Sequence, residues 1–150
     1  MTYEQATTSI AERFSGAQIE AGVPLVVRLP VDQWREFAQF AKDTLGCRFF
    51  NFLSAVDWKE LGLEVVARVD NIDTGVALLM KTRLAPGTSE CPSLVPVYRG
   101  ADWMERECFD MFGIRFDGHP RLRRILLTDD WQGHPLLKSY AVDTPHPPYR

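Results

Sequence analysis

The sequence lacks the long apolar run that a membrane-spanning helix needs. Its uninterrupted apolar stretches, such as residues 75–80 (GVALLM), fall far short of the roughly 20 residues required. We therefore expect no segment that crosses a bilayer. The first five residues form neither a basic n-region nor an apolar h-region, so we also expect no export signal and a cytosolic location.

Cysteine is scarce, and the glycine-rich nucleotide motifs are missing. Cys47, Cys91 and Cys108 are far apart and form no Cys-x-x-Cys pair, which argues against a disulfide framework and against iron–sulfur ligation within the chain. We expect three buried free thiols. Because there is no Gly-x-Gly-x-x-Gly and no Walker lysine loop, nothing predicts a nucleotide pocket.

An excess of positive charge is missing as well. The 17 Lys and Arg residues against 20 Asp and Glu give a net charge of −3. No overall basic field therefore exists to hold nucleic acid or an anionic membrane. What the sequence does have is 150 residues of which 45% are apolar, which is the composition of one globular domain with a real core.

The periodicity of apolar residues predicts an α+β core. Thr2 and Gln5 form a capping-box pattern that starts a first helix, which ends at Gly16, and a second helix follows Pro30 and ends at Gly46. Strands are predicted at residues 25–29, 49–58, 63–70 and 76–84. We predict an α+β fold in which a sheet of about four mainly antiparallel strands is covered by helices.

A third helix is predicted from Asp102, which forms a second capping pattern with Glu105, to Gly113. Its apolar arc comprises Met104, Cys108, Phe109, Met111 and Phe112. Glu105 interrupts this arc. We therefore expect its carboxylate to be shielded from solvent and bound to local backbone amides, to Arg123 or to Arg124.

The opposite side of this helix is predicted to be polar and exposed. It carries Arg106, Glu107 and Asp110 beside Trp103, and Arg106 and Asp110 are spaced to form an ion pair along it. Glu105 and Glu107 are two residues apart and point to different sides. This spacing argues against a shared acid/base site.

Residues 114–150 change in texture, because proline and glycine interrupt them repeatedly. We predict an extended irregular C-terminal arm, residues 114–150, beyond a compact core of residues 1–113, the whole forming a single domain. The arm has few ways to bury itself, so it must lie on the core or on another protein. The closing residues 144–150 are expected to be polyproline-like and to become ordered on a partner.

The arm contains a near repeat of the form Gly-His-Pro-x-Leu-base at residues 118–123 and 133–138. Glycine permits an unusual backbone angle, proline fixes the next one, and the histidine between them can bond backbone carbonyls, so each copy predicts a rigid corner. A metal site would have to use His119, His134 and either Cys108 or Asp110. Their spacing matches no standard zinc arrangement.

Between the two corners lies a strip that is typical of an interface. Three arginines precede the apolar residues 125–127, and an acidic and aromatic group follows them. Arginine is favoured in interfacial carboxylate pairs. The alternative is a solvated edge strand guarded by basic residues.

The sequence from Glu105 to Lys138 closely resembles the signature of the family of C subunits of NADH-quinone oxidoreductase, the hydrophilic subunits of respiratory complex I. The resemblance rests on Glu-Arg-Glu-Cys-Phe-Asp-Met-Phe-Gly-Ile at residues 105–114, on both Gly-His-Pro corners, and on Leu-Arg-Arg-Ile-Leu at residues 122–126. Leu137 and Ser139 depart from the usual Arg and Asp of the family, which removes one expected docking ion pair.

The resemblance implies a non-catalytic scaffold and assembly subunit of the peripheral arm of a proton-translocating NADH-quinone oxidoreductase. Such a subunit docks to the D subunit, which holds the quinone site, on the cytoplasmic side of the inner membrane. It reaches the membrane only through the complex, binds no nucleic acid and has no active site of its own. FMN, iron–sulfur clusters and quinone then belong to other subunits.

The resemblance and the pattern of the arm together define a set of partner-binding residues. They are Glu105, Arg106, Glu107, Asp110, Gly118, His119, Pro120, Arg123, Arg124, Asp130, Trp131, Gly133, His134, Pro135 and Lys138. An alternative function is the equivalent subunit of a membrane-bound hydrogenase or formate hydrogenlyase. A minor alternative is a free-standing metal-dependent enzyme built on His119 and His134.

Overall fold

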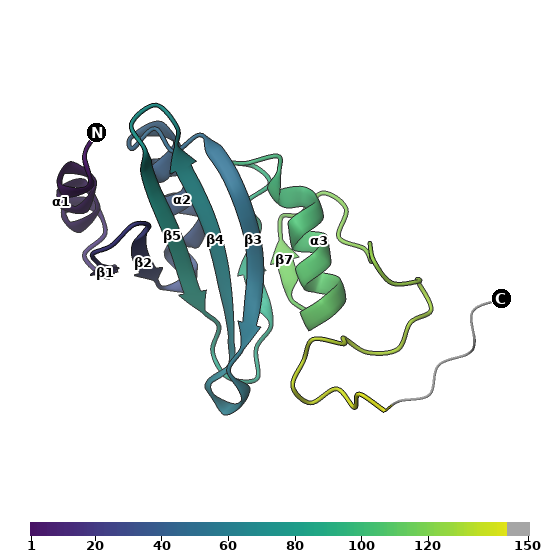
Figure 1. Ribbon diagram of the computed structural model, residues 1–150. Helices are drawn as coiled ribbons and strands as arrows, with labels where there is room; N and C mark the ends of the chain where they lie inside the picture. The colour runs from purple at the N-terminus through teal and green to yellow at the C-terminus, as the bar shows by residue number, and fades with distance from the viewer. Residues whose placement is uncertain (144–150) are drawn as a thin grey trace.

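The computed structural model describes residues 1–143 and contains a five-stranded sheet in the order β1-β2-β5-β4-β3 (Figure 1). The strands are β1 (Gln18–Glu20), β2 (Leu25–Leu29), β3 (Phe49–Asp57), β4 (Leu63–Asn71) and β5 (Val76–Arg83). Strand β2 runs parallel to β5, whereas the other neighbours are antiparallel. A second, two-stranded parallel sheet joins β6 (Glu90–Pro92) to β7 (Arg115–Asp117).

Three α-helices complete the fold: α1 (Tyr3–Arg13), α2 (Trp34–Asp43) and α3 (Ala101–Phe112), with short 3-10 turns at Val31–Gln33 and Lys59–Leu61. The predicted α+β class is confirmed, although the main sheet has five strands instead of about four. Strand β1 was missed because three residues give no alternating signal. Residues 144–150, for which a polyproline-like structure was expected, lie outside the described residues.

The core lies between the sheet and α2, which is behind the sheet in Figure 1. Alternate side chains of β2, β4 and β5 point to this side, as the pleat of a strand requires. From α2, Trp34, Phe37, Ala38 and Ala41 are fully buried against them. The 3 and 4 spacing of these residues therefore forms the apolar face that the sequence predicted.

Helix α1 closes one end of this core. The Thr2 side chain accepts from the Gln5 amide at 3.2 Å, and the Gln5 side chain accepts from the Thr2 amide at 2.9 Å, so the predicted capping box is confirmed. The rings of Phe14 and Phe37 pack edge-on with their centroids 5.1 Å apart, which joins the end of α1 to α2.

Helix α3 lies beside β3 and begins one residue earlier than predicted (Figure 1). The capping prediction for Asp102 was wrong. The N-cap residue is Gly100, no side chain caps the helix, and Asp102 lies in the first turn. Its carboxylate instead lies 3.0 Å from Nε2 of His119, on the arm.

The buried core extends past Gly113 into strand β7. Ile114 and Phe116 are 0% and 3% exposed, and β7 pairs with β6. Arg35 of α2 donates to the Asp117 carbonyl at 2.6 Å. The division into a core of residues 1–113 and an arm of residues 114–150 stays a prediction, but a chain cut after Gly113 would lose these buried side chains.

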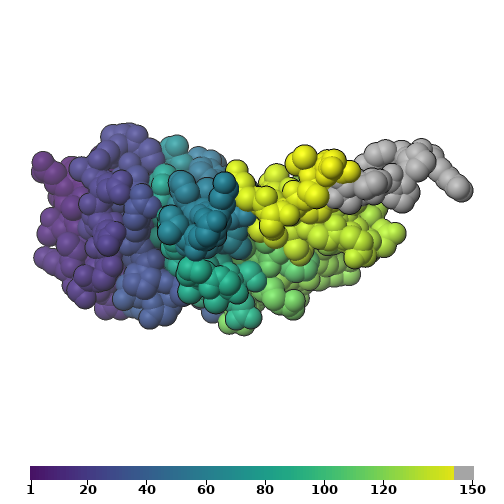
Figure 2. Space-filling model, turned by 90° about the horizontal axis from the view of Figure 1, so that it is seen from below, coloured from purple at the N-terminus to yellow at the C-terminus, as the bar shows by residue number. Residues whose placement is uncertain are grey.

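Residues 118–143 first run along α3 on the side away from the five-stranded sheet and then return to the end of β3, where the Lys138 amide meets Asp57 (Figure 1). In Figure 2 the N-terminal elements lie on one side of the five-stranded sheet and residues 118–143 lie on the other. The three cysteines are buried free thiols, as predicted. Within residues 1–143, no helix combines the length and apolarity needed to cross a bilayer.

Candidate partner-binding site

Asp110 is the centre of the contacts between α3 and the arm. Its carboxylate is fully buried. Oδ1 lies 2.7 Å from Nη1 of Arg124, and Oδ2 accepts from the amides of Ile125, Leu126 and Leu127 at 3.2, 2.8 and 2.9 Å. Burial acts to raise the pKa of Asp110, but Arg124 and the three amides outweigh it, so the pKa lies below its usual 3.8. The group is therefore a buried anion at neutral pH.

Arg124 extends this network to a second part of the arm. Its Nη2 donates to the carbonyls of Trp131 and Gly133, both at 3.0 Å. The guanidinium of Arg124 therefore joins α3 to residues 131–133 of the arm. The planar fork of arginine suits this role, because its donors leave in fixed directions toward several acceptors.

The predicted pair between Arg106 and Asp110 was wrong. Asp110 binds Arg124, and Arg106 donates from Nε and Nη2 to the carbonyls of Arg123 and Arg124 at 3.1 and 2.9 Å. The part of this side that carries Arg106 and Asp110 is thus covered by the arm, whereas Trp103 and Glu107 are exposed as predicted. A helical wheel shows which residues share a side, but it does not show what packs against that side.

The two Gly-His-Pro corners fasten opposite ends of α3. At the first, His119 Nε2 lies 3.0 Å from the Asp102 carboxylate, while Nδ1 accepts from the Arg121 amide at 3.0 Å. At the second, His134 Nδ1 lies 2.9 Å from the Asp110 carbonyl. Since a carbonyl only accepts, His134 carries its proton on Nδ1, whereas His119 carries its proton on Nε2.

Glu105 is fully buried and bound by a backbone amide, as expected, although this amide belongs to the loop after β6 and not to its own helix. Its carboxylate accepts from the Ser93 hydroxyl at 2.7 Å and from the Leu94 amide at 2.5 Å, and not from Arg123 or Arg124. Burial raises its pKa to about 7, against the opposing effects of these two hydrogen bonds. Glu105 therefore anchors α3 to the loop after β6, and not to the arm.

Comparison with known proteins places this geometry in a family. Residues 27–146 match the family model described as the respiratory-chain NADH dehydrogenase 30 Kd subunit. The chain belongs to this family. The C subunit of NADH-quinone oxidoreductase from Rhodobacter capsulatus is 40% identical over 89% of this chain and 70% of that protein. The C subunit from Citrifermentans bemidjiense is 33% identical over 97% of this chain and 94% of that protein. The resemblance seen in residues 105–138 is confirmed.

Two solved structures are similar to this one. A trypsin-resistant fragment of Nqo5 is matched over 100% of its length by 81% of this chain, with 23% identity and a TM-score of 0.71. A chain of the archaeal membrane-bound sulfane sulfur reductase is matched over 77% of its length by 85% of this chain, with 26% identity and a TM-score of 0.74. The first likeness concerns the fold alone.

The remaining predicted partner-binding residues lie mostly on the surface of the protein. The exposed ones are Glu107, Gly118, Pro120, Arg123, Asp130, Gly133 and Lys138. Trp131 and Pro135 are half-buried. Apart from Glu105, the predicted set therefore contains residues whose contacts fasten the arm to α3 and residues that are exposed to a partner.

The structure does not group the candidate metal ligands Cys108, Asp110, His119 and His134 into a site. In the described part of the chain, no three His, Cys, Asp or Glu side chains are grouped to hold a metal ion. His119 uses both ring nitrogens within the protein, and His134 binds the other end of α3.

Two side chains with long-range contacts, Asp57 and Ser93, were missed from the sequence. Asp57, in the last position of β3, accepts from the Lys138 amide at 2.8 Å and from the Lys59 amide at 2.8 Å. Ser93 joins Glu105 to Arg35, because its hydroxyl donates to the first and its carbonyl accepts from the second at 2.8 Å. The Asp57–Lys138 and Ser93–Arg35 pairs are 81 and 58 residues apart, so no local spacing indicates them.

Gly113 ends α3 in the left-handed conformation, with φ of 73°, and lies directly against His134. A Cβ atom there would lie 2.8 Å from Cδ2 of His134. We expect Gly113→Ala to lower the free energy of unfolding by about 2 to 3 kcal/mol, from the backbone cost and from displacement of the His134 hydrogen bond. Chemical denaturation measures the change.

Gly75→Ala is the matched control, because Gly75 has φ of 74° and a Cβ added to it would meet no atom within 4 Å. It should cost only the backbone part, about 1 kcal/mol. Equal losses for the two variants would mean that the contact with His134 contributes nothing.

Proposed function

We propose that this chain is a non-catalytic scaffold and assembly subunit in the peripheral arm of a proton-translocating NADH-quinone oxidoreductase, where it docks to the D subunit that holds the quinone site. The observation that carries the proposal is the state of the arm. Its backbone is held to α3 by Asp110 and Arg124, while Leu126 and Leu136 remain 62% and 52% exposed. A segment that is fixed in place yet presents apolar side chains to water is suited to docking.

Membership of the family indicates that the partners of this docking surface are other subunits of a respiratory complex. In the proposal, FMN, iron–sulfur clusters and quinone are held by other subunits, and this chain positions its neighbours. It reaches the cytoplasmic side of the inner membrane only through the complex and has no nucleic-acid partner. The net charge of −3 agrees with the absence of nucleic acid from its partners.

A second candidate is the equivalent subunit of another respiratory membrane complex, such as a membrane-bound hydrogenase or formate hydrogenlyase. The likeness to a chain of the archaeal sulfane sulfur reductase favours keeping it, since a similar fold serves in a complex named for another reaction. Purifying the native complex and comparing NADH-dependent quinone reduction with hydrogen evolution distinguishes the two.

A truncation tests the proposal directly. A chain cut after Gly118 retains Ile114, Phe116 and strand β7, so we expect it to keep the circular dichroism of the folded core. Without residues 119–150 it should fail to copurify with the other subunits of the complex, while the full chain does. Normal assembly of the folded truncated chain would contradict the docking role.

A cut after Gly113 serves as a contrast. It removes two buried side chains, each worth roughly 1.5 to 3 kcal/mol of burial, together with the partner strand of β6. We expect that shorter chain to lose its cooperative unfolding transition.

A further inference from the structure

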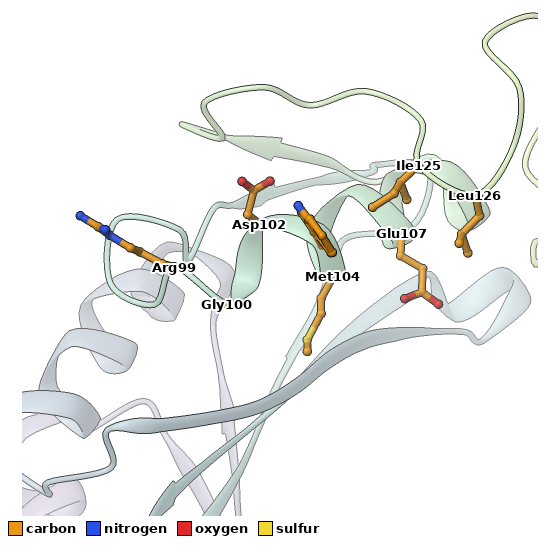
Figure 3. A pocket seen from close by; sticks show the side chains of 8 residues that line it. Arg99, Gly100, Asp102, Met104, Glu107, Ile125 and Leu126 are labelled. Atoms are coloured by element: carbon orange, nitrogen blue, oxygen red, sulfur yellow. The ribbon is translucent and has the colours of Figure 1, made fainter.

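An open hollow of about 510 Å³ lies between the first turns of α3 and the arm (Figure 3). Its apolar lining comes from Trp103 and Met104 on α3 and from Ile125 and Leu126 on the arm. Trp103 is 70% exposed and Leu126 is 62% exposed. The Asp110 and Arg124 network holds residues 125–126, which line the hollow on the side of the arm, against the helix.

It is unusual that these solvent-exposed apolar side chains lie close together. Single exposed apolar residues are normal on a protein surface, but here two largely exposed side chains and two half-buried ones line the same hollow. Trp103 is the most exposed tryptophan among residues 1–143. An exposed tryptophan that lines a hollow is the kind of residue that contributes most to binding a partner.

The hollow is lined by one cation, Arg99, and by two acidic residues, Asp102 and Glu107. Figure 3 shows Arg99 at one end and Glu107 at the other, with Met104 between them. The Glu107 side chain makes no hydrogen bond or ion pair with any residue that the structure describes, and it is exposed. Asp102 also lines the hollow, but His119 contacts its carboxylate.

Positive charge continues beyond Arg99. A second hollow of about 500 Å³ shares Arg99 and Gly100 with the first, and Lys42 and Arg48 line it without any carboxylate among its lining residues. The two hollows adjoin at Arg99 and Gly100, and we call them together the groove. Lys42, Arg48 and Arg99 line its basic end, where Asp102 is held by His119, and Glu107 lies beyond the apolar residues. In a chain with a net charge of −3, this basic end is a local feature.

We propose that this groove binds one short segment of a partner subunit that carries an acidic residue, an apolar residue and a basic residue in that order. The acidic residue faces Arg99 and Arg48, the apolar side chain packs on Trp103 and Leu126, and the Lys or Arg faces Glu107. A segment in the reverse order would bring like charges together at both ends, so the charges set its direction as well as its identity. The proposal rests on the proposed function and names the surface and the chemistry of one docking contact.

Photo-crosslinking in the assembled complex identifies the occupant. The variant Trp103→p-benzoylphenylalanine is incorporated into the full chain, the purified complex is illuminated, and the cross-linked peptide is sequenced by mass spectrometry. We expect a peptide of another subunit with acidic, apolar and basic residues in the proposed order. A peptide from residues 144–150 of this chain, a peptide from a second copy, or no cross-linked peptide would overturn the proposal.

Copurification measures the contribution of the groove. Trp103→Ala and Glu107→Lys should each weaken retention of the chain in the complex by about tenfold or more, as expected for a central aromatic residue and for a reversed charge. Ile72→Ala and Glu12→Lys are the matched controls. Ile72 is 72% exposed on the turn after β4, Glu12 is exposed on α1, and neither lines the groove.

The outcomes distinguish a failure of the groove proposal from a failure of the proposed scaffold function. If the wild-type chain copurifies with the complex and the groove variants do so equally well, the groove proposal is wrong and the scaffold function stands. If the wild-type chain itself does not join the complex, the proposed function fails. Unchanged melting temperatures of the variants show that the substituted surface residues act on docking and not on folding.

Discussion

Replacing Arg124 with alanine is expected to lower the free energy of unfolding by about 3 kcal/mol and to release the arm from α3. Arg124 is the cation that faces the fully buried Asp110 carboxylate, at 2.7 Å. Removing one partner of a buried ion pair costs about 3 to 5 kcal/mol, because the other charge stays buried without compensation. We take the lower end of this range, since a released arm would let water reach Asp110.

Denaturation by urea measures the change in stability, and hydrogen exchange locates it. The amides of Ile125, Leu126 and Leu127 donate to Oδ2 of Asp110, so their protection should fall in the Arg124→Ala variant. The other half of the network, Trp131 and Gly133, should lose protection of nearby amides as well, because Arg124 binds both carbonyls.

Arg123→Ala is the control for this experiment. Arg123 is the same residue type one position away and is exposed, and it contributes to the network only through its carbonyl, which Arg106 binds. We expect a change of less than about 0.5 kcal/mol, as is usual for a surface substitution. Equal effects of the two substitutions would refute the central role of the ion pair with Asp110.

The fold was predictable where one element carries its own signal. The capping box of Thr2 and Gln5 and the apolar spacing of α2 are local, and both appear in the structure as expected. The parallel pairing of β2 with β5 depends on a crossover connection that contains α2, β3 and β4, which the pattern within a strand does not encode. Short β1 and β7 have too few residues for an alternating pattern.

The sequence indicated which residues belong to the candidate site, but not which of them contact each other. The sequence correctly indicated that Glu105 is buried, because it interrupts an apolar arc. It misplaced Asp110 on an exposed side, because the residues that cover it lie 14 to 17 positions later in an irregular segment. Contacts of irregular segments follow from three-dimensional packing, and no periodic pattern in the sequence predicts them.

Glu105 makes the stability of the full chain depend on pH. Burial raises its pKa from 4.5 to about 7, while the Leu94 amide, the Ser93 hydroxyl and Arg35 lower it and Asp102 raises it. A raised pKa means that the folded state binds the proton more tightly than the unfolded state does. The contribution of this group to stability is therefore fully present below about pH 4.5 and is lost as the pH rises to about 7.

We expect the wild-type chain to lose roughly 3 kcal/mol of stability through this group between pH 4.5 and pH 8, and Glu105→Gln to lack that loss. The value follows from about 1.4 kcal/mol for each pKa unit of difference between the two states. Glutamine has nearly the same shape and can still accept from the Leu94 amide. Asp110 does not confuse the comparison, because its pKa lies below 3.8, outside this pH range.

Urea unfolding at several pH values between 5 and 8 measures the two slopes. If the Glu105 carboxyl ionises near neutrality, the stability of the wild-type chain falls relative to that of Glu105→Gln across this range and the difference becomes constant above about pH 7. Parallel curves would show that the buried carboxyl is already ionised at pH 5, with the Ser93 and Leu94 hydrogen bonds offsetting its burial. The same pH range governs how firmly α3 is held to the loop after β6, since Glu105 is the side chain of α3 that joins them through hydrogen bonds.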